Sequence, residues 1–256
     1  TSLAGIFIIL AFAWMISSNR KVINWRVILW GTALQMLFAI FIFVIPAGSK
    51  LFLLVNDAVV KLLDSATAGT RFIFGRLALP PGTKNEMGEE SLGFILAFQA
   101  LPTIIFFASL MGVLYYVGVM PRLIKIFSKV FTRLMRISGA ESLSVSSNIF
   151  VGVEANMTVL PYLGKMTKSE LCTILAAGMS TTASSVLALY VFILQSSFPA
   201  IAGHLVSASI LSAIAAIVIS KIIMPETEKP ETLGFDIAPH FQKESSIMEA
   251  IINNAN

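Results

Sequence analysis

The sequence predicts an all-α, polytopic membrane protein, and three observations support this fold class. Of the 256 residues, 56% are hydrophobic and only 12% are charged, about half the charged share of an ordinary soluble domain. The apolar residues gather in uncharged runs near the roughly 20 residues that a helix needs to cross a bilayer. The single cysteine, Cys172, excludes a disulfide framework and a cysteine-rich metal site. The net charge of +4 comes without a basic aromatic module, so we expect no nucleic acid partner.

Residues 1–91 predict two spans and one surface helix. The run 3–16 is uncharged, and we expect a spanning helix whose first turns precede residue 1. Residues 27–46 form a second span, which follows a basic connector. Within 47–91, apolar residues recur at helical spacing between Lys and Asp residues. This pattern predicts an amphipathic surface helix, and the equal numbers of acids and bases in 47–91 fit the outer face of the membrane.

Residues 92–137 predict a third span and a second surface helix. The span occupies 92–120, and Pro102 inside it predicts a kink. Residues 121–137 carry five Arg or Lys and no acid, interleaved with apolar residues, which predicts a cationic surface helix. The positive-inside rule places this helix in the cytoplasm. Its cations serve topology and surface anchoring in the plainer interpretation, and binding of anionic lipid is the alternative.

The segment 138–224 departs from simple spans. Residues 138–165 mix polar and apolar side chains and predict a re-entrant hairpin with two short helical arms and a broken tip. Such backbone is tolerated at membrane depth only where protein or a wet cavity surrounds it. Two spans follow at 168–195 and 200–224, because fifty uncharged residues are too many for one helix. The polar stretch 225–256 predicts a cytoplasmic linker and the beginning of another helix. The prediction is thus about five transmembrane helices, two interfacial helices and one re-entrant hairpin.

The predicted hairpin tip carries Glu154. A carboxylate is costly to bury at membrane depth, so Glu154 is a functional candidate. The alternative is that Glu154 caps a half-helix in a loop outside the membrane. Asn148, six residues earlier, has an amide oxygen suited to a hard cation, together with carbonyls that a broken helix frees.

The span after the hairpin has five hydroxyls in six residues, at 180–185. One interpretation is close helix packing, with each hydroxyl bonded to its own helical turn. The other is a partly unwound helix that offers hydroxyl and carbonyl oxygens to an ion or solute. The residues alone leave both interpretations open.

Several motifs occur in one order along nearly the whole chain. They are Asn19-Arg20-Lys21 with Ile23-Asn24-Trp25-Arg26, Phe98-Gln99-Ala100-Leu101-Pro102, Ser138-Gly139-Ala140-Glu141, Asn148-Ile149-Phe150-Val151-Gly152 and Met166-Thr167-Lys168-Ser169-Glu170-Leu171. With these motifs the chain resembles the concentrative nucleoside transporters. The resemblance implies a homotrimer of elevator-type symporters, in a cell membrane such as the bacterial inner membrane, in which cation entry drives nucleoside uptake without a cofactor. It also implies scaffold helices over 1–91 and one transport-domain repeat over 138–224.

The resemblance assigns roles to individual residues. The sodium ligands would be the Asn148 side chain, the Val151 carbonyl, the Thr181 hydroxyl and the Thr182 carbonyl. The nucleoside would contact the site formed by Gly152, Val153, Glu154 and Val186. Sodium is expected rather than a proton, because Asn148 and Thr181 are neutral oxygen donors, whereas a proton-coupled site would depend on Glu154.

Two departures from the family pattern matter. The family usually reads Gly-Gln-Thr-Glu-Ala-Pro at the tip, whereas Gly152-Val153-Glu154-Ala155-Asn156 is one residue shorter and lacks the Gln, Thr and Pro. The missing groups hydrogen-bond the base, so the solute is alternatively a nucleobase, a modified nucleoside or another riboside. The family's second repeat is not found within residues 1–256, so we expect these residues alone not to transport.

Other function classes are disfavoured. A membrane-embedded enzyme would use Glu154 and His204, which the predicted topology places toward opposite membrane faces. The sequence has no GxSxG or HExxH motif, so we expect no catalytic residues and no enzyme. A non-transporting membrane scaffold is a further alternative.

Overall fold

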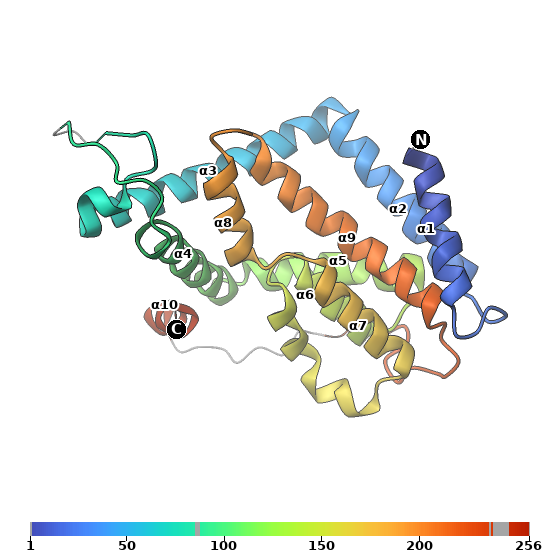
Figure 1. Cartoon of the computed structure of the whole chain (residues 1–256). Coiled ribbons are helices and arrows are strands. Elements are labelled where there is room, and N and C mark those ends of the chain that lie inside the picture. The colour runs from blue at the N-terminus through green and yellow to red at the C-terminus, as the bar shows by residue number, and fades with distance from the viewer. Residues whose placement is uncertain (1, 85–87, 236, 238–245, 256) are drawn as a thin grey trace. The chain divides into compact units, whose positions relative to one another are not determined.

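The computed structural model contains helices and no strands in the residues that it describes, which are 2–84, 88–235, 237 and 246–255 (Figure 1). Of Ser2, Leu3, Val153, Glu154, Met157 and Ala255, it describes the backbone alone. The chain divides into two compact units. The first unit comprises residues 1–45, 119–183 and 208–242, and the second comprises residues 46–118, 184–207 and 243–256.

The first unit holds the predicted hairpin and its neighbours. Its elements are α1 (Ser2–Ile16), α2 (Trp25–Phe43), α5 (Val119–Met135), α6 (Gly139–Asn148), the 3₁₀ helix η2 (Val153–Lys165), α7 (Lys168–Ser180) and, from Ala208 onward, α9 (Ile201–Ile223). The second unit holds α3 (Pro46–Phe74), η1 (Gly75–Ala78), α4 (Leu96–Tyr116), α8 (Ser184–Leu194), the start of α9 and α10 (Ile247–Ala255).

Four stretches of the described chain are long and apolar enough to cross a membrane. They are α2, α4, the pair α7–α8 and α9. They match four of the five predicted spans and make the chain a multi-pass membrane protein. The fifth, α1, has 15 residues. At 1.5 Å per residue it is about 22 Å long, which is shorter than the ~30 Å hydrocarbon core.

The helix α4 begins later than the sequence predicts. Gly93 adopts a φ of +95°, which a helix does not accommodate, so the helix starts at Leu96 instead of residue 92. At the other end, Gly118 has a φ of +83° and follows the last turn. Pro102 lies inside α4, as expected.

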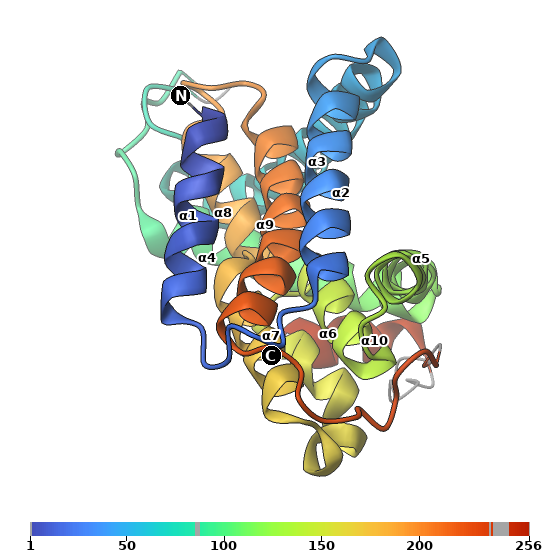
Figure 2. The same cartoon turned by 90° about the vertical axis from the view of Figure 1, so that its right-hand side faces the viewer.

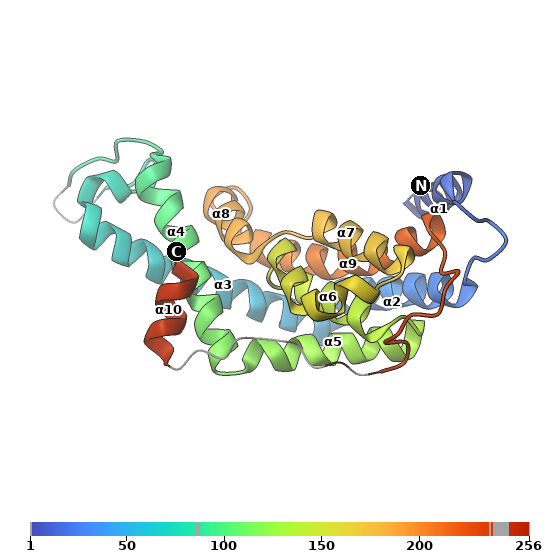
Figure 3. The same ribbon diagram turned by 90° about the horizontal axis from the view of Figure 1, so that it is seen from below.

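In the first unit, α2 packs closely on α9. A Cβ on Gly31 of α2 would overlap the side chain of Val218, so only glycine permits this approach. The Gln35 side chain donates a hydrogen bond of 3.1 Å to the Leu211 carbonyl of α9. On another side of the unit, α5 runs beside α6, and the Thr132 hydroxyl donates to the Ser142 hydroxyl at 2.8 Å (Figure 3). These contacts fix the scaffold on which the hairpin is built.

The second unit has its own apolar core, which joins α3, α4, α8 and the start of α9. The buried members are Leu63, Phe107, Leu187, Ala188, Val191 and Ala202. His204 stacks on Phe198 and meets Phe52 edge to face, with ring centroids 5.0 Å apart in each case. The histidine therefore belongs to an aromatic cluster of the second unit, whereas the Glu154 backbone belongs to the first. The helix expected at 247–256 is present as α10, which packs on α4.

Candidate functional site

The hairpin forms as two short helices joined by a break. Its first arm, α6, is buried along its whole length, and the Ser138 side chain caps it by accepting from the Glu141 N–H at 3.1 Å. The linker holds the same end, because the Gly139 N–H donates to the Thr232 carbonyl at 2.9 Å. The second arm, η2, is a 3₁₀ helix. The predicted pair of arms is thus confirmed, although its depth in a membrane stays a prediction.

The hairpin turns at Gly152. This residue has φ +94° and ψ −158°, a region that is nearly exclusive to glycine. A Cβ at this position would lie 2.7 Å from the Cα of Ala183. Ala183 belongs to the gap between α7 and α8, so the tip backbone touches the broken span. The span is interrupted at 181–183, as the second interpretation of the hydroxyl cluster expects, and the hairpin tip abuts this gap.

Asn148 is the last residue of α6 and is completely buried. Its Nδ2 donates to the Asn156 Oδ1 at 2.9 Å, and the same oxygen accepts from the Ser144 hydroxyl at 2.8 Å. In the described part of the chain, the Asn148 Oδ1 and the Ser147 Oγ are buried and have no hydrogen-bond partner. Buried polar oxygens in native proteins are nearly always satisfied. These two oxygens therefore fit a ligand that accepts lone pairs, which a hard cation does.

The broken span begins with a strong helix start and ends in an extended residue. At its start, the Thr167 and Glu170 side chains form a capping box. After Ser180, Thr181 is extended at φ −103° and ψ 150°, and α8 begins only at Ser184. The Thr181 hydroxyl donates to the Ala177 carbonyl at 2.9 Å. This hydroxyl therefore bonds its own helical turn, as the first interpretation expects, and its role as an ion ligand stays a prediction.

The structure brings together some of the predicted site residues. Asn148, Val151 and Gly152 lie in the hairpin of the first unit, and Thr181 and Thr182 lie in the gap that the hairpin tip touches. Val153 and Glu154 begin η2, and their side chains lie outside the described residues. Val186 belongs to α8 and hence to the second unit. Asn156 was not among the predicted site residues, because an isolated Asn after the tip carries no periodic signal.

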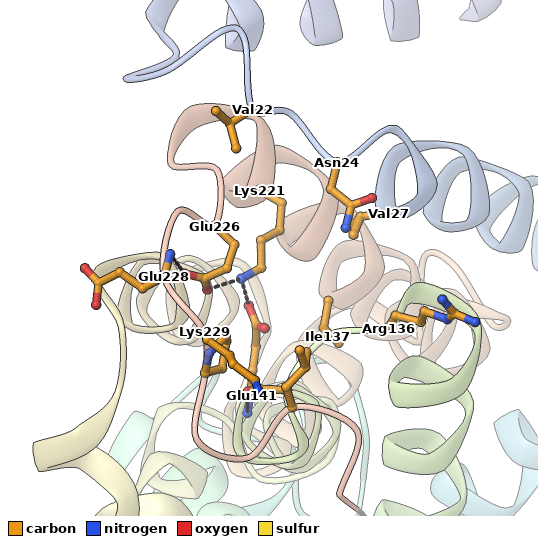
Figure 4. A pocket seen from close by; sticks show the side chains of 13 residues that line it. Val22, Asn24, Val27, Arg136, Ile137, Glu141, Lys221, Glu226, Glu228 and Lys229 are labelled. Atoms are coloured by element: carbon orange, nitrogen blue, oxygen red, sulfur yellow. Dashed lines mark hydrogen bonds and ion pairs between the residues drawn. The ribbon is translucent and has the colours of Figure 1, made fainter.

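A buried ion pair lies at the capped end of the hairpin (Figure 4). The Lys221 ammonium, on the last turn of α9, is 2.9 Å from the Glu141 carboxylate of α6. It also donates to the Ser169 hydroxyl of α7 at 3.0 Å and lies 3.5 Å from the Glu226 carboxylate of the linker. One lysine thus connects four segments of the first unit. Sequence reasoning gave this pair no role, although a single cation that ends an uncharged span is a usable signal.

The ion pair borders a cavity of about 450 Å³. Charged side chains of both signs line it, including Arg136, Lys229 and Glu228 (Figure 4). Across the residues that the structure describes, no three His, Cys, Asp or Glu side chains cluster as a transition-metal site requires.

Two family models match the chain. The model for the N-terminus of Na⁺-dependent nucleoside transporters matches residues 4–77. A model described as nucleoside recognition matches residues 97–197, which include the hairpin and the broken span.

Curated relatives and solved structures agree with these models. The chain is 32% identical over its full length to the nucleoside permease NupC of Helicobacter pylori, of which it covers 58%. It is 35% identical to an uncharacterized transporter of Haemophilus influenzae, with 90% of this chain and 52% of the relative aligned. Sodium/nucleoside cotransporter 1 of Rattus norvegicus is 34% identical, with 89% of this chain and 33% of the relative aligned. The chain thus spans about half the length of these bacterial relatives and a third of the rat protein.

Solved structures show the same fold. The structure of CNTnw in an inward-facing, substrate-bound state matches with a TM-score of 0.84 at 31% identity, over 99% of this chain and 58% of that one. A substituted form of CNTnw in an outward-facing state matches with a TM-score of 0.85 at 31% identity, over 99% of this chain and 59% of that one. The overall helical fold of this chain is therefore shared with known transporter structures. The chain belongs to the concentrative nucleoside transporter family, a family of membrane transporters and not of enzymes, and corresponds to its N-terminal portion.

Proposed function

We propose that the protein carries out sodium-coupled nucleoside uptake by secondary active symport, with an elevator-type movement of its transport domain. The observation that carries this proposal is the buried, unpartnered Asn148 Oδ1 beside the contact between the hairpin tip and the broken span. Half-helices that end near one another at membrane depth are the usual way in which transporters bind small ions. The names of the rat and Helicobacter pylori relatives support the substrate class.

Sodium binds at the hairpin and the gap in this proposal. Its ligands are the Asn148 side chain, the Val151 carbonyl, the Thr181 hydroxyl and the Thr182 carbonyl. Asn156 contributes indirectly: its Oδ1 holds the Asn148 Nδ2, which directs the Asn148 Oδ1 away from Asn156 and toward the ion. All four ligands are neutral oxygen donors, which suit a hard monovalent cation and need no titration.

The nucleoside binds next to the ion in this proposal. Gly152, Val153 and Glu154 of the tip and Val186 of α8 contact it. The Glu154 carboxylate accepts hydrogen bonds from the nucleoside, and Gly152 lets the backbone approach the gap. The assembly is a homotrimer in the bacterial inner membrane, and its partners are the nucleoside, sodium and the lipid bilayer.

The coupling ion is tested with the natural protein that carries this chain, reconstituted in proteoliposomes. Uptake of radiolabelled uridine and adenosine is measured with an inward sodium gradient, and separately with an inward proton gradient without sodium. We expect uptake to require the sodium gradient and to persist with a protonophore. Uptake at full rate without sodium that a protonophore abolishes would show proton coupling instead.

A different solute on the same fold is the second candidate. The observation that favours it is the tip, which is one residue shorter than the family pattern and has Val153 where a hydrogen-bonding side chain is usual. A site without these polar groups rejects related solutes less strongly. Competition of uridine uptake by nucleobases and modified nucleosides separates the candidates, because a nucleoside site is inhibited best by nucleosides.

A further inference from the structure

The helix α5 presents three different faces. One packs into the first unit, and its buried members are Met120, Ile124, Ser128, Phe131, Thr132 and Met135. Of the other two faces, one is exposed and cationic, and the other is apolar and only partly covered within the unit.

The second face is cationic. Its members, here called the basic face, are exposed and recur every three or four residues: Arg122, Lys125, Lys129 and Arg133. Residues 119–136 contain no Asp or Glu. Among the described residues, none of these four cations forms an ion pair, whereas Arg76, Lys84, Lys165 and Lys221 each do. Within the described part of the chain, the basic face therefore has no carboxylate in ion-pair contact.

The third face is apolar and only partly covered. Its members are Leu123, Ile126, Val130 and Leu134, of which Ile126 is 59% exposed. At about 100° of rotation per residue, this face lies roughly 100° around the helix from the basic face. A phospholipid offers the two complementary groups side by side: a phosphate for the cations and an acyl chain for the apolar residues.

The orientation of α5 within the first unit matches a membrane surface. Figure 2 views α5 along its axis, while α2 of the same unit runs lengthwise, so α5 lies across the direction of α2. The Arg26 Nε, at the start of α2, donates to the Leu134 carbonyl of α5 at 3.3 Å. The neighbouring Trp25 is 65% exposed, as expected of an aromatic side chain at a membrane interface. The last turns of α5 therefore lie beside the first turn of α2.

We propose that the basic face of α5 binds the headgroups of anionic phospholipids in the leaflet at the Trp25 end of α2. The acyl chains lie against Leu123, Ile126, Val130 and Leu134. The positive-inside rule explains positive charge on one side of the membrane. It does not explain why these cations line one face of a helix that carries no carboxylate. Clusters of this kind on interfacial helices attract acidic lipids. The inference is independent of the ion and the solute that the protein transports.

The helix α3 supplies an internal comparison. It is the other amphipathic helix, and its exposed cations Lys50, Lys61 and Arg71 share it with Asp57 and Asp64. Removing these three cations removes the same charge, two Lys and one Arg, as removing Arg122, Lys125 and Lys129. The two triple variants therefore have equal net charge and differ only in the helix that is changed.

The test measures lipid association with this chain in bilayers. Spin-labelled phosphatidylglycerol and phosphatidylcholine are compared by electron paramagnetic resonance in membranes that contain the chain. We expect the wild type to select phosphatidylglycerol at least threefold, and 0.5 M NaCl to reduce that selectivity. The R122Q/K125Q/K129Q variant should lose most of it, whereas K50Q/K61Q/R71Q should keep it. A variant that exchanges Arg and Lys at the three α5 positions should also keep it, and it controls for folding.

Three results would overturn the proposal. The first is a wild type without headgroup selectivity, as expected if a second copy of the chain covers the face. The second is an equal loss in the α3 and α5 variants, which would show an effect of net charge alone. The third is a loss of selectivity in the Arg–Lys exchange variant while its melting temperature is unchanged.

Discussion

At the scale of single residues, sodium binding at the proposed site depends on how the Asn148 side-chain amide is oriented. Its amide nitrogen is held by Asn156 at 2.9 Å, and its oxygen is buried without a protein partner. Without that hydrogen bond the amide rotates, and its NH₂ group can face the ion. Asn156 is thus a positioning residue in this account and not an ion ligand.

The Asn156→Ala variant tests this role. One oriented hydrogen bond is worth about 1 kcal/mol, so we expect the sodium concentration for half-maximal transport to rise about 5- to 10-fold. The maximal rate at saturating sodium should change little. Asn156→Asp keeps the acceptor and should restore the sodium response. The matched control is Ser144→Ala, which removes the other donor to Asn156 and leaves the Asn148 contact in place. An unchanged sodium response in Asn156→Ala, with sodium dependence intact in the wild type, would refute the positioning role alone.

Gly152 gives a second prediction at this scale. An alanine there adopts a strained backbone conformation, at about 1–3 kcal/mol, and its Cβ meets Ala183. We expect Gly152→Ala to lower the free energy of unfolding by at least that amount and to abolish sodium-driven uptake. Gly164→Ala is the control, because a Cβ at Gly164 has no neighbour within 4 Å. Denaturant titration measures the free energy of unfolding of the two purified variants. Equal values for Gly152→Ala and Gly164→Ala would contradict the close contact of the tip with Ala183.

At the scale of elements, the Glu141–Lys221 pair holds the first arm of the hairpin to the end of α9. Removing one partner leaves a buried charge unpaired, which costs about 3–5 kcal/mol. We therefore expect Lys221→Met to destabilise the protein by that amount. The double variant Glu141→Gln/Lys221→Met should recover most of the loss, because no charge is then stranded.

The control for this pair is an exposed one in the same unit. Lys165 lies 2.9 Å from Glu231, and that contact raises the pKa of Lys165, but both side chains are exposed. Solvent screens such a pair, so Lys165→Met should not measurably change stability. Similar losses of stability in Lys221→Met and Lys165→Met would contradict this prediction. They would show that the buried Glu141–Lys221 pair contributes no more to stability than the exposed Lys165–Glu231 pair.

The elements also show how far the sequence carries the prediction. Uncharged runs predicted the spans, because a span must exclude charge over the thickness of the bilayer. Polar residues inside an apolar segment predicted the break at the hairpin tip, whereas the hydroxyl cluster at 180–185 left a break after Ser180 as one of two interpretations. The partner of Asn148 and the partner of Lys221 were not predictable, because periodicity reports the exposure of one helix and not which helix packs against it. The 3₁₀ form of η2 and the late start of α4 depend on local backbone angles that residue patterns do not encode.

At the scale of the whole molecule, the chain spans about half the length of its bacterial relatives. The first unit contains the hairpin and the gap, where the proposed sodium ligands lie, and also the buried ion pair. Val186, the proposed solute contact on α8, belongs to the other unit. Activity is therefore a property to be measured on the natural protein that carries this chain.

The most direct measurement compares Glu154→Gln with the wild type in sodium-driven uridine uptake by proteoliposomes. Glu231→Gln, which neutralises an exposed carboxylate of the linker, is the matched control. The account predicts rapid uptake by the wild type and the control, and a loss of at least tenfold in Glu154→Gln, because the tip carboxylate binds the nucleoside. Equal uptake by all three proteins, or no sodium-driven uptake by a folded wild type, would contradict it.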